Sequence, residues 1–376
     1  MPKKILIIAG EASGDLYGAQ LVKSLKQQQP SLGIFAMGGK LMQQAGAEII
    51  CDISQFAVIG FFEVLKNIQK FKSAFKLILS FIRTHHPAAL VLIDFPGFNL
   101  RLAKKINKSI PVIYYISPQL WAWGKNRLSL IKRYVTQMLV IFEFEKKFYK
   151  SHGIEVIYLG HPLLELIHLE CSQPALFARY RLYENKHTIG LMPGSRLNEI
   201  KKILPLLLNS AALIKNKIPE VQFVLIKAET IELDIIRQLI KRYKINITII
   251  ETEHYAAVKG CELVLACSGT ATVELALMEV PMIIVYKTTL LTWLILKLLI
   301  KVKFIGMVNI IANEKVVSEL IQFQANPKTI SHHALKLLHR ENNRADIREK
   351  LRLLKENFLP HNASERAAEI IISYLA

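Results

Sequence analysis

Short, strongly apolar runs alternate with longer amphipathic segments along almost the whole chain. Such runs are typical of buried parallel strands, and the segments between them have the periodicity of helices. The first series of runs comprises Ile5–Ala9, Ala89–Ile93, Val112–Tyr115 and Met138–Phe142. The second series comprises Thr188–Met192, Val221–Ile226, Ile245–Ile250, Leu263–Ala266 and Met282–Val285. Two series predict two doubly wound α/β domains, each with a ligand-facing edge at the carboxyl ends of its strands.

The domain boundaries follow from where the two series begin and end. We expect an N-terminal domain over residues 1–160, a linker over 161–186, a second domain over 187–326 and C-terminal helices over 327–376. A chain of 376 residues is also longer than a typical domain with one hydrophobic core. The length and the pattern therefore both predict two domains.

The net charge of +19 indicates an anionic partner or surface. The charge is spread among bulky apolar residues without an arginine-rich tract or a nucleic-acid module, so a membrane surface is favoured over nucleic acid. No apolar run reaches the roughly 18 residues of a membrane-spanning helix, and the first run is too short for a signal peptide. The four cysteines have no CxxC spacing, so neither a zinc site nor a disulfide framework is indicated. We expect a cytoplasmic protein.

Two segments are candidates for contact with a membrane. Residues 61–82 contain a helical stripe of large apolar side chains that begins at Phe61, with Phe62 off the stripe and lysines nearby. Residues 289–297, around Trp293, resemble an interfacial helix. Phe61, Phe62 and Trp293 are therefore predicted membrane contacts, and ordinary core packing is the alternative for both segments.

Two turns of small residues in the second half each follow a predicted strand and precede a helical pattern. At Ser268–Thr270, the exposed backbone N–H groups and the helix dipole would bind phosphate, and Glu274, about one turn later, suits the hydroxyls of a ribose. At Pro193–Arg196, the arginine could pair with a phosphate and stabilise a departing diphosphate. The alternatives are an N-capped core helix at the first turn and a solvated helical turn with Glu199 at the second.

Carboxylates follow two strands of the first domain. Glu11 and Asp15 flank a glycine turn that matches neither a dinucleotide nor a P-loop fingerprint. Asp94 ends a very apolar strand, where partial desolvation would raise its pKa toward that of a general base, and capping of the next helix is the alternative. The aromatic loop Tyr114–Trp123 suits the apolar face of a sugar or an acyl chain, or else forms a buried plug.

Taken in order, these motifs resemble the lipid-A-disaccharide synthases, peripheral membrane glycosyltransferases of Gram-negative bacteria, over nearly the whole chain. The matching segments are Gly10–Asp15, Ile93–Asn99, Ser117–Trp123, Phe144–Lys146, Gly160–Pro162, Pro193–Arg196 and Ser268–Glu274. The resemblance implies a GT-B fold, in which two Rossmann-like doubly wound domains flank an interdomain cleft. It also implies a role in lipid A biosynthesis at the cytoplasmic face of the inner membrane.

The implied reaction transfers 2,3-diacylglucosamine from its UDP derivative to 2,3-diacylglucosamine 1-phosphate (lipid X), with inversion at the anomeric carbon. The products are a β-1,6-linked disaccharide 1-phosphate and UDP. Neither a cofactor nor a bound metal is implied, so protein groups must stabilise the departing UDP. The implied partners are the two lipid substrates and the membrane surface, and both a monomer and a homodimer are compatible with the resemblance.

The resemblance also assigns residues to roles. Asp94 is the first choice of base, with Glu11 and Asp15 as alternatives. The residues assigned to UDP are Gly194, Ser195, Arg196, Ser268, Gly269, Thr270 and Glu274. The residues assigned to contacts with the acceptor, an acyl chain or a sugar are Ser13, Gly14, Asn99, Gln119, Trp121, Trp123 and Asn309. The chain has Val308 and Ser318 where the family usually has prolines, and these departures bear on the loop around Asn309.

Three other functions remain as alternatives. Another GT-B enzyme acting on a UDP-sugar, such as a UDP-GlcNAc transferase or a 2-epimerase, would share the diphosphate site but not the aromatic loop. A non-catalytic lipid carrier would keep the apolar helices and would not need Arg196 and Glu274. A nucleic-acid-binding protein is indicated by charge alone.

Overall fold

The computed structural model describes residues 3–53, 68–122, 124–299 and 303–375. The chain divides into two compact units. Unit 1 contains Met1–Glu165 and Asn357–Ala376, and unit 2 contains Leu166–Glu356. The segments 161–186 and 327–376, predicted as a linker and as C-terminal helices, are therefore each divided between the two units.

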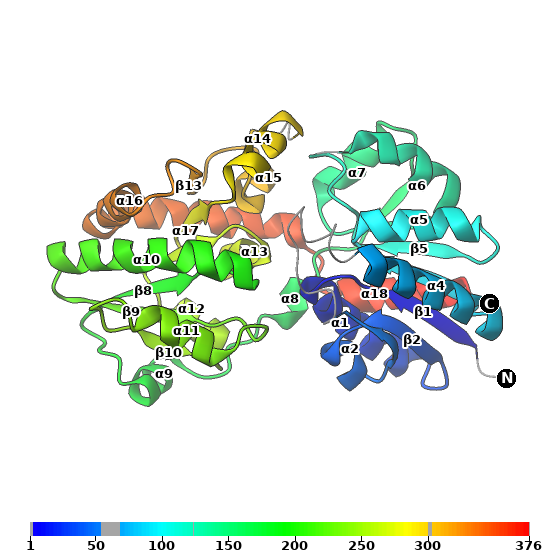
Figure 1. The fold of residues 1–376 in the computed structure, drawn as a ribbon, viewed down its shortest axis with the longest axis horizontal. Helices are drawn as coiled ribbons and strands as arrows, with labels where there is room; N and C mark the ends of the chain where they lie inside the picture. The colour runs from blue at the N-terminus through cyan, green and yellow to red at the C-terminus, as the bar shows by residue number, and fades with distance from the viewer. Residues whose placement is uncertain (1–2, 54–67, 123, 300–302, 376) are drawn as a thin grey trace. The chain divides into compact units, whose positions relative to one another are not determined.

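Unit 1 is built on a parallel sheet of seven described strands (Figure 1). The strands are β1 (Lys4–Ile8), β2 (Gly33–Gly38), β3 (Glu48–Asp52), β4 (Ala89–Ile93), β5 (Val112–Tyr115), β6 (Gln137–Val140) and β7 (Val156–Tyr158). Their spatial order is β3-β2-β1-β4-β5-β6-β7, and every pairing is parallel. Because the order reverses between β1 and β4, the carboxyl ends of these two strands flank the position where doubly wound sheets bind ligands.

Helices pack on this sheet and bury its central strands. Every residue of β4 is buried, as a strand covered on both faces requires. α1 also packs against α18, near the end of the chain. The described helices are α1 (Ala12–Gln28), α2 (Lys40–Gln44), α4 (Ile68–His85), α5 (Pro96–Ile106), η2 (Lys125–Arg127), α6 (Leu128–Tyr134), α7 (Glu143–Lys150), α8 (Leu163–Leu166), η3 (Glu356–Phe358) and α18 (Ala363–Ser373).

The described part of the apolar stripe predicted over 61–82 belongs to the core of unit 1. On α4, Phe71 and Phe75 pack against the core cluster. Phe81 is buried, and its ring lies 4.9 Å from that of Phe35 and 4.2 Å from that of His85. For these residues the structure therefore gives core packing. Phe61 and Phe62, predicted as membrane contacts, lie outside the described residues.

Unit 2 repeats the same architecture with six described strands in the order β10-β9-β8-β11-β12-β13, all paired in parallel. The strands are β8 (His187–Met192), β9 (Val221–Ile226), β10 (Thr248–Ile250), β11 (Leu263–Cys267), β12 (Met282–Tyr286) and β13 (Ser318–Ile321). The order reverses between β8 and β11. The helices are α9 (Gln173–Tyr180), α10 (Leu197–Lys217), α11 (Leu233–Ile240), α12 (His254–Lys259), α13 (Thr270–Leu277), α14 (Leu290–Leu299), α15 (Met307–Ala312), α16 (Pro327–His339) and α17 (Glu341–Lys355).

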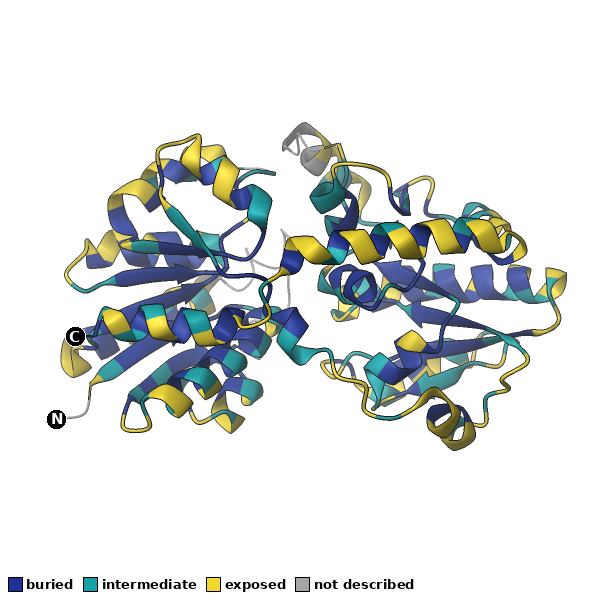
Figure 2. Ribbon diagram, turned by 180° about the vertical axis from the view of Figure 1, so that it is seen from behind, coloured by how far each residue is buried: buried dark blue, intermediate teal, exposed yellow. Residues whose placement is uncertain are grey.

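In both units the strands are largely buried, and the helices carry exposed residues on their outer faces (Figure 2). The apolar runs of the sequence thus become the sheets, and the amphipathic segments become the helices that cover them. Within the described ranges, no helix is long and apolar enough to cross a membrane.

Candidate active site

Glu11 and Asp94 lie at the carboxyl ends of neighbouring strands in unit 1. Glu11 is the N-cap residue of α1, just after β1, and Asp94 directly follows β4. The two strands are paired, with Ile8 opposite Leu92. Because the strand order reverses here, both carboxylates stand at the ligand-binding edge expected of a doubly wound sheet.

The environment of Asp94 suits a general base. Burial first, and then the negative charge of Glu11, raise the pKa of Asp94 to about 7, although a hydrogen bond from the Phe95 backbone opposes the shift. A base whose pKa lies near the working pH is partly ionised and still takes up a proton readily. The side chain does not cap α5, since the N-cap residue of that helix is Phe95.

The backbone that carries Asp94 has an uncommon conformation. Asp94 and Phe95 have φ angles of 42° and 48°, in the left-handed region, which costs roughly 1–2 kcal/mol for each non-glycine residue. Tyr114 donates its hydroxyl proton to the Asp94 carbonyl at 2.5 Å, and Asn99 Nδ2 donates to the same oxygen at 2.8 Å. Asn99 Nδ2 also donates to the Ile93 carbonyl at 3.2 Å. These bonds hold the strained turn in place.

Asn99 bonds the turn through its Nδ2 alone, because its buried Oδ1 has no partner among the described residues, and the predicted contact with the acceptor stays a prediction. It is fully buried, and its amide serves the backbone of the Asp94 turn. Its place in the Ile93–Asn99 motif indicated a residue that meets a ligand, whereas the residue lies on the inner face of α5.

Asp15 is likewise engaged within the protein. Its carboxylate accepts hydrogen bonds from the backbone N–H groups of Gly39, Leu41 and Met42, at 2.7, 3.1 and 3.2 Å, and the residue is 6% exposed. It thus anchors the start of α2, which is a structural role, and its use as the alternative base stays a prediction.

The two small residues beside Asp15 differ in exposure. Gly14 is buried, and a Cβ there would lie 3.1 Å from that of Ala9, so this glycine lets α1 pack closely on the end of β1. Ser13 is partly exposed. Both predicted contacts with the acceptor stay predictions.

The aromatic loop after β5 is tied to α7 by a buried carboxylate. Glu145, 1% exposed, accepts hydrogen bonds from Ser117 Oγ at 2.5 Å and from Trp121 Nε1 at 3.2 Å. The indole of Trp121 is partly exposed, and Gln119 is exposed. Trp123 lies outside the described residues. Glu145 is part of a family motif in the sequence, but the motif alone indicates no role for it.

In unit 2, the two turns predicted to bind phosphate, at Pro193–Arg196 and Ser268–Thr270, follow neighbouring strands. The strands that precede them, β8 and β11, are paired, with Met192 opposite Ala266. The charges of Glu199 and Arg196 also act on the pKa of the Cys267 thiol at the end of β11, which burial raises to about 12. Both turns therefore meet where the strand order reverses, the ligand-binding position of this sheet.

The turn at Gly194–Arg196 has its backbone donors already occupied. Glu199 Oε2 accepts from the N–H groups of Ser195 at 3.2 Å and Arg196 at 3.3 Å, and its other oxygen pairs with the Arg196 guanidinium at 2.9 Å. Gly194 has φ +111°, and a Cβ there would lie 2.5 Å from Glu199. An internal carboxylate thus occupies the N–H groups of Ser195 and Arg196, and the predicted binding of a diphosphate at this turn, with the charge of Arg196, stays a prediction.

The turn at Ser268–Thr270 is open. Gly269 is exposed with φ +154°, and a Cβ at this position would have no atom within 4 Å, so both its conformation and the space above it suit a close ligand. Within the described residues, the N–H groups of Gly269, Thr270 and Ala271 donate to no protein group. Donors of this kind at the start of a helix suit an anion, so the predicted phosphate site at this turn stays a candidate.

Glu274 lies about one helical turn along α13 from this candidate site. It is partly exposed, and burial raises its pKa to about 7. Its charge in turn raises the pKa of Tyr255 on α12, where burial is the larger cause. A carboxylate one turn from open backbone donors is compatible with the predicted ribose contact of a nucleoside diphosphate, which stays a prediction.

Asn309, predicted to contact a sugar or the acceptor, is fully buried and bonded within the protein. Its Oδ1 accepts from the N–H groups of Val316 at 2.8 Å and Val317 at 3.0 Å, and its Nδ2 donates to Glu319 at 2.7 Å. It therefore shapes the loop between α15 and β13, and its predicted contact with a sugar or the acceptor stays a prediction.

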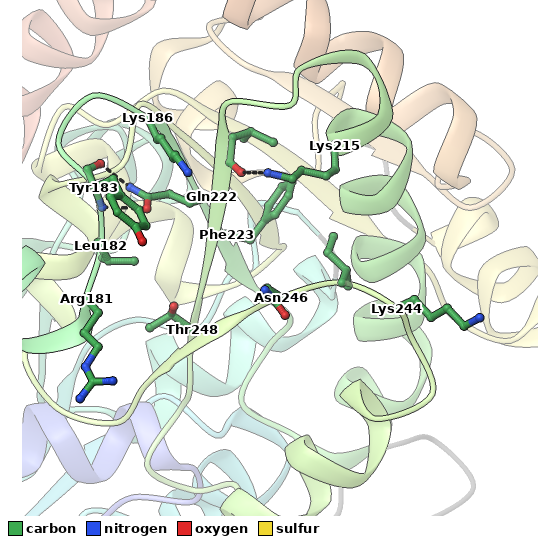
Figure 3. A pocket seen from close by; sticks show the side chains of 12 residues that line it. Arg181, Leu182, Tyr183, Lys186, Lys215, Gln222, Phe223, Lys244, Asn246 and Thr248 are labelled. Carbon is green, nitrogen blue, oxygen red and sulfur yellow. Dashed lines mark hydrogen bonds between the residues drawn. The ribbon is translucent and has the colours of Figure 1, made fainter.

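A cavity of about 450 Å³ in unit 2 lies away from these turns, at the amino ends of β9 and β10 (Figure 3). Two of its polar side chains are engaged within the protein: Gln222 bonds both the backbone of Tyr183 and Thr188, and Lys215 bonds the carbonyls of Pro219 and Val221. We assign it no part in the chemistry. Among the described residues, no group of three or more His, Cys, Asp or Glu could hold a metal ion.

Solved structures that also contain two doubly wound units identify the class of fold. The chain matches UDP-GlcNAc 2-epimerase from Neisseria meningitidis with a TM-score of 0.68 and 13% identity, covering 98% of this chain and 100% of that one. It matches the glycotransferase of kitacinnamycin with a TM-score of 0.68 and 12% identity, covering 100% of both chains. The predicted GT-B fold is confirmed.

The chain belongs to the lipid-A-disaccharide synthase family. A family model described as lipid-A-disaccharide synthetase matches residues 5–371. The chain is 38% identical over 373 residues to the lipid-A-disaccharide synthase of Trichlorobacter lovleyi, covering 99% of this chain and 97% of the relative. It is 38% identical over 370 residues to that of Coxiella burnetii, covering 98% of each. The predicted resemblance is thus confirmed, and the chain is a glycosyltransferase, not a lipid carrier or a nucleic-acid-binding protein.

Proposed function

We propose that the chain condenses UDP-2,3-diacylglucosamine with 2,3-diacylglucosamine 1-phosphate (lipid X), giving the β-1,6-linked disaccharide 1-phosphate and UDP. The observation that carries this proposal is the open turn at Ser268–Thr270 with Glu274 one turn further. It offers backbone donors suited to an anion and, one helical turn along α13, a carboxylate suited to ribose hydroxyls. Membership of the synthase family supports this substrate pair over the alternative of another UDP-sugar enzyme.

Unit 2 would hold the leaving group. The N–H groups at the start of α13 would bind the diphosphate, Glu274 would accept from the ribose hydroxyls, and Arg196 would offset the charge that develops on the departing UDP. The N–H groups and Arg196 act on the negative charge that increases as the bond from the anomeric carbon to the diphosphate breaks, whereas Glu274 positions the nucleoside.

Unit 1 would supply the base. Asp94 would remove the proton from the 6-hydroxyl of the acceptor as that oxygen attacks the anomeric carbon from the face opposite UDP. One C–O bond forms and one breaks, the proton moves to Asp94, and the anomeric configuration inverts. The raised pKa of Asp94, about 7, fits this transfer near neutral pH.

The apolar surface of α14 would contact the membrane in which both lipids reside. Leu290, Leu291 and Leu294 are 55%, 53% and 47% exposed, and Phe323 beside them is 68% exposed. Trp293 lies 5.3 Å from Phe323 between ring centroids, with the Lys297 ammonium 5.1 Å from the Trp293 ring. Apolar side chains bordered by an indole and a cation are typical of an interfacial helix, which supports peripheral binding at the cytoplasmic face of the inner membrane.

The reaction is tested with purified protein and the two diacylated sugars. We expect disaccharide and UDP in equal amounts without added metal, and no UDP release above background would contradict the proposal. Membrane contact is tested by sedimentation with anionic vesicles. Leu290→Ser with Leu294→Ser should weaken binding, whereas the exposed Leu353→Ser on α17 serves as the control.

A further inference from the structure

Glu145 is a buried carboxylate at the ligand-facing edge of unit 1 that the proposed chemistry does not use. It lies in the first turn of α7, just after β6, and is 1% exposed. Within the described residues no cation pairs with it. A buried carboxylate without a cation is costly, so its presence calls for a physical reason.

The hydrogen bonds of Glu145 point to the loop after β5. One oxygen accepts from Ser117 Oγ at 2.5 Å and from Trp121 Nε1 at 3.2 Å, and the other accepts from the Phe142 backbone at 3.3 Å. One turn later on α7, the Tyr149 hydroxyl donates to the Pro118 carbonyl at 3.4 Å. α7 thus holds the loop at several points, while Trp121 stays partly exposed.

The geometry favours the ionised carboxylate, although burial opposes it. All three partners are donors, and the start of α7 adds the positive end of a helix dipole. Burial nevertheless raises the pKa of Glu145 to about 7. The other ionisable group facing it is Tyr149, whose pKa is raised by burial and by the charges of Glu145 and Asp94. An apolar residue would fill this space with a smaller desolvation penalty, but it could not accept the hydrogen bond that orients the indole.

We propose that Glu145 is a positioning residue for the acceptor: by accepting the indole N–H, it fixes the ring of Trp121 against Phe144 and so presents one defined apolar surface to the acceptor sugar. The Trp121 and Phe144 rings are 5.1 Å apart and nearly perpendicular. Sugars stack their apolar C–H faces on such rings, so the orientation of the indole decides the fit. This inference rests on the proposed function, because it takes the acceptor to be a sugar.

The kinetic test separates orientation from folding. Trp121→Phe keeps a ring and removes the N–H that Glu145 accepts, and Glu145→Gln keeps one acceptor and removes the charge. Glu143→Gln, on the same turn of α7 but partly exposed, is the matched control. Loss of one hydrogen bond to a charged group should raise the KM for the acceptor about tenfold in the first two variants. The value of kcat and the affinity for UDP should stay within about threefold, and the control should match wild type. An unchanged acceptor KM in Trp121→Phe would overturn the proposal.

A fluorescence titration tests the contact itself without relying on catalysis. The chain has three tryptophans, so the Trp123→Phe, Trp293→Phe background leaves Trp121 as the emitter. Its emission should change with a midpoint near pH 7 as Glu145 takes up a proton. Adding Glu145→Gln should abolish this change, and adding Glu143→Gln should preserve it. A titration that survives Glu145→Gln would overturn the inference. A wild-type enzyme inactive on the two lipids would instead contradict the proposed function.

Discussion

Glu11 and Asp94 follow paired strands at the point where the sheet of unit 1 reverses its order, and the charge of Glu11 raises the pKa of Asp94. Two carboxylates in one site differ in protonation when their environments push their pKa values apart. Here burial and the neighbouring charge both favour the protonated form of Asp94. The pair therefore contains one group suited to take up a proton near pH 7.

Asp94→Asn should abolish turnover. The amide has the same shape but cannot accept the proton, and loss of a positioned base typically costs 10²–10⁴-fold, so kcat should fall at least about 100-fold. UDP affinity, measured by isothermal titration, should stay within about threefold, because the proposed UDP site lies in unit 2. Turnover near the wild-type rate would move the role of base to another group.

Glu11→Gln should shift the pH dependence of the reaction. Removing the negative charge stabilises ionised Asp94, so its pKa falls and the acidic limb of the kcat/KM profile moves to lower pH. The profile is measured in buffers of constant ionic strength. If the acidic limb does not move, the loss of activity at low pH is caused by protonation of a group other than Asp94.

Tyr114→Phe should loosen the strained turn that carries Asp94. The variant loses the hydrogen bond from the Tyr114 hydroxyl to the Asp94 carbonyl, at a cost of about 1 kcal/mol in the free energy of unfolding. The misplaced carboxylate should also lower kcat several-fold. Tyr115, the next residue of β5, is equally buried but points to the other face of the sheet, so Tyr115→Phe is the control. Equal effects on kcat in both variants would argue against a specific role for Tyr114.

The sequence predicts the fold well because the strands are short, apolar and buried. The run Ala89–Ile93 coincides with β4, and Val112–Tyr115 coincides with β5. A strand covered on both faces needs such an apolar run whatever its neighbours are, so local sequence is sufficient. The predicted strand over 245–250 is shorter in the structure, where β10 begins at Thr248, at the edge of the sheet.

The candidate site is less predictable, because exposure and partners depend on the tertiary structure. A motif identifies Asn99 and Asn309 as polar residues near the ligand edge, but it does not show that both are buried and that each also bonds backbone groups. For Glu145 and Glu199 the difficulty is the reverse. Each follows a strand by a few residues, and nothing local shows that one receives an indole N–H and the other occupies a phosphate-suited turn.

Glu274→Gln should weaken nucleoside binding and remove its pH dependence. Burial raises the pKa of Glu274 to about 7, and ribose hydroxyls donate to the ionised form, so wild-type affinity should fall as the pH falls below about 7. Uridine is the appropriate titrant, since it has no phosphate that ionises in this range. The variant should bind about tenfold more weakly at pH 8, with a flat profile from about pH 6 to 8. A variant that keeps the wild-type slope would show that another group titrates.

Glu199→Gln should have opposite effects on two proposed properties of the turn at Gly194–Arg196, the orientation of Arg196 for catalysis and the affinity for UDP. One amide oxygen can still accept from the N–H groups of Ser195 and Arg196, but the amide nitrogen cannot pair with the guanidinium. Arg196 is then less well fixed for the charge on the departing UDP, so kcat should fall about tenfold. Removal of a negative charge beside the diphosphate should leave UDP affinity equal or higher.

These opposite effects distinguish positioning from mere folding, which would lower kcat and UDP affinity together with the melting temperature. Arg196→Lys is the companion variant, because it keeps the positive charge and loses the planar fork that pairs with a carboxylate or a phosphate. It should show the same loss of kcat as Glu199→Gln if the orientation of the cation matters, and almost none if charge alone is sufficient. Equal kcat for wild type and both variants would show that Arg196 does not take part in the reaction. Stabilisation of the departing UDP would then be assigned to the N–H groups at the start of α13.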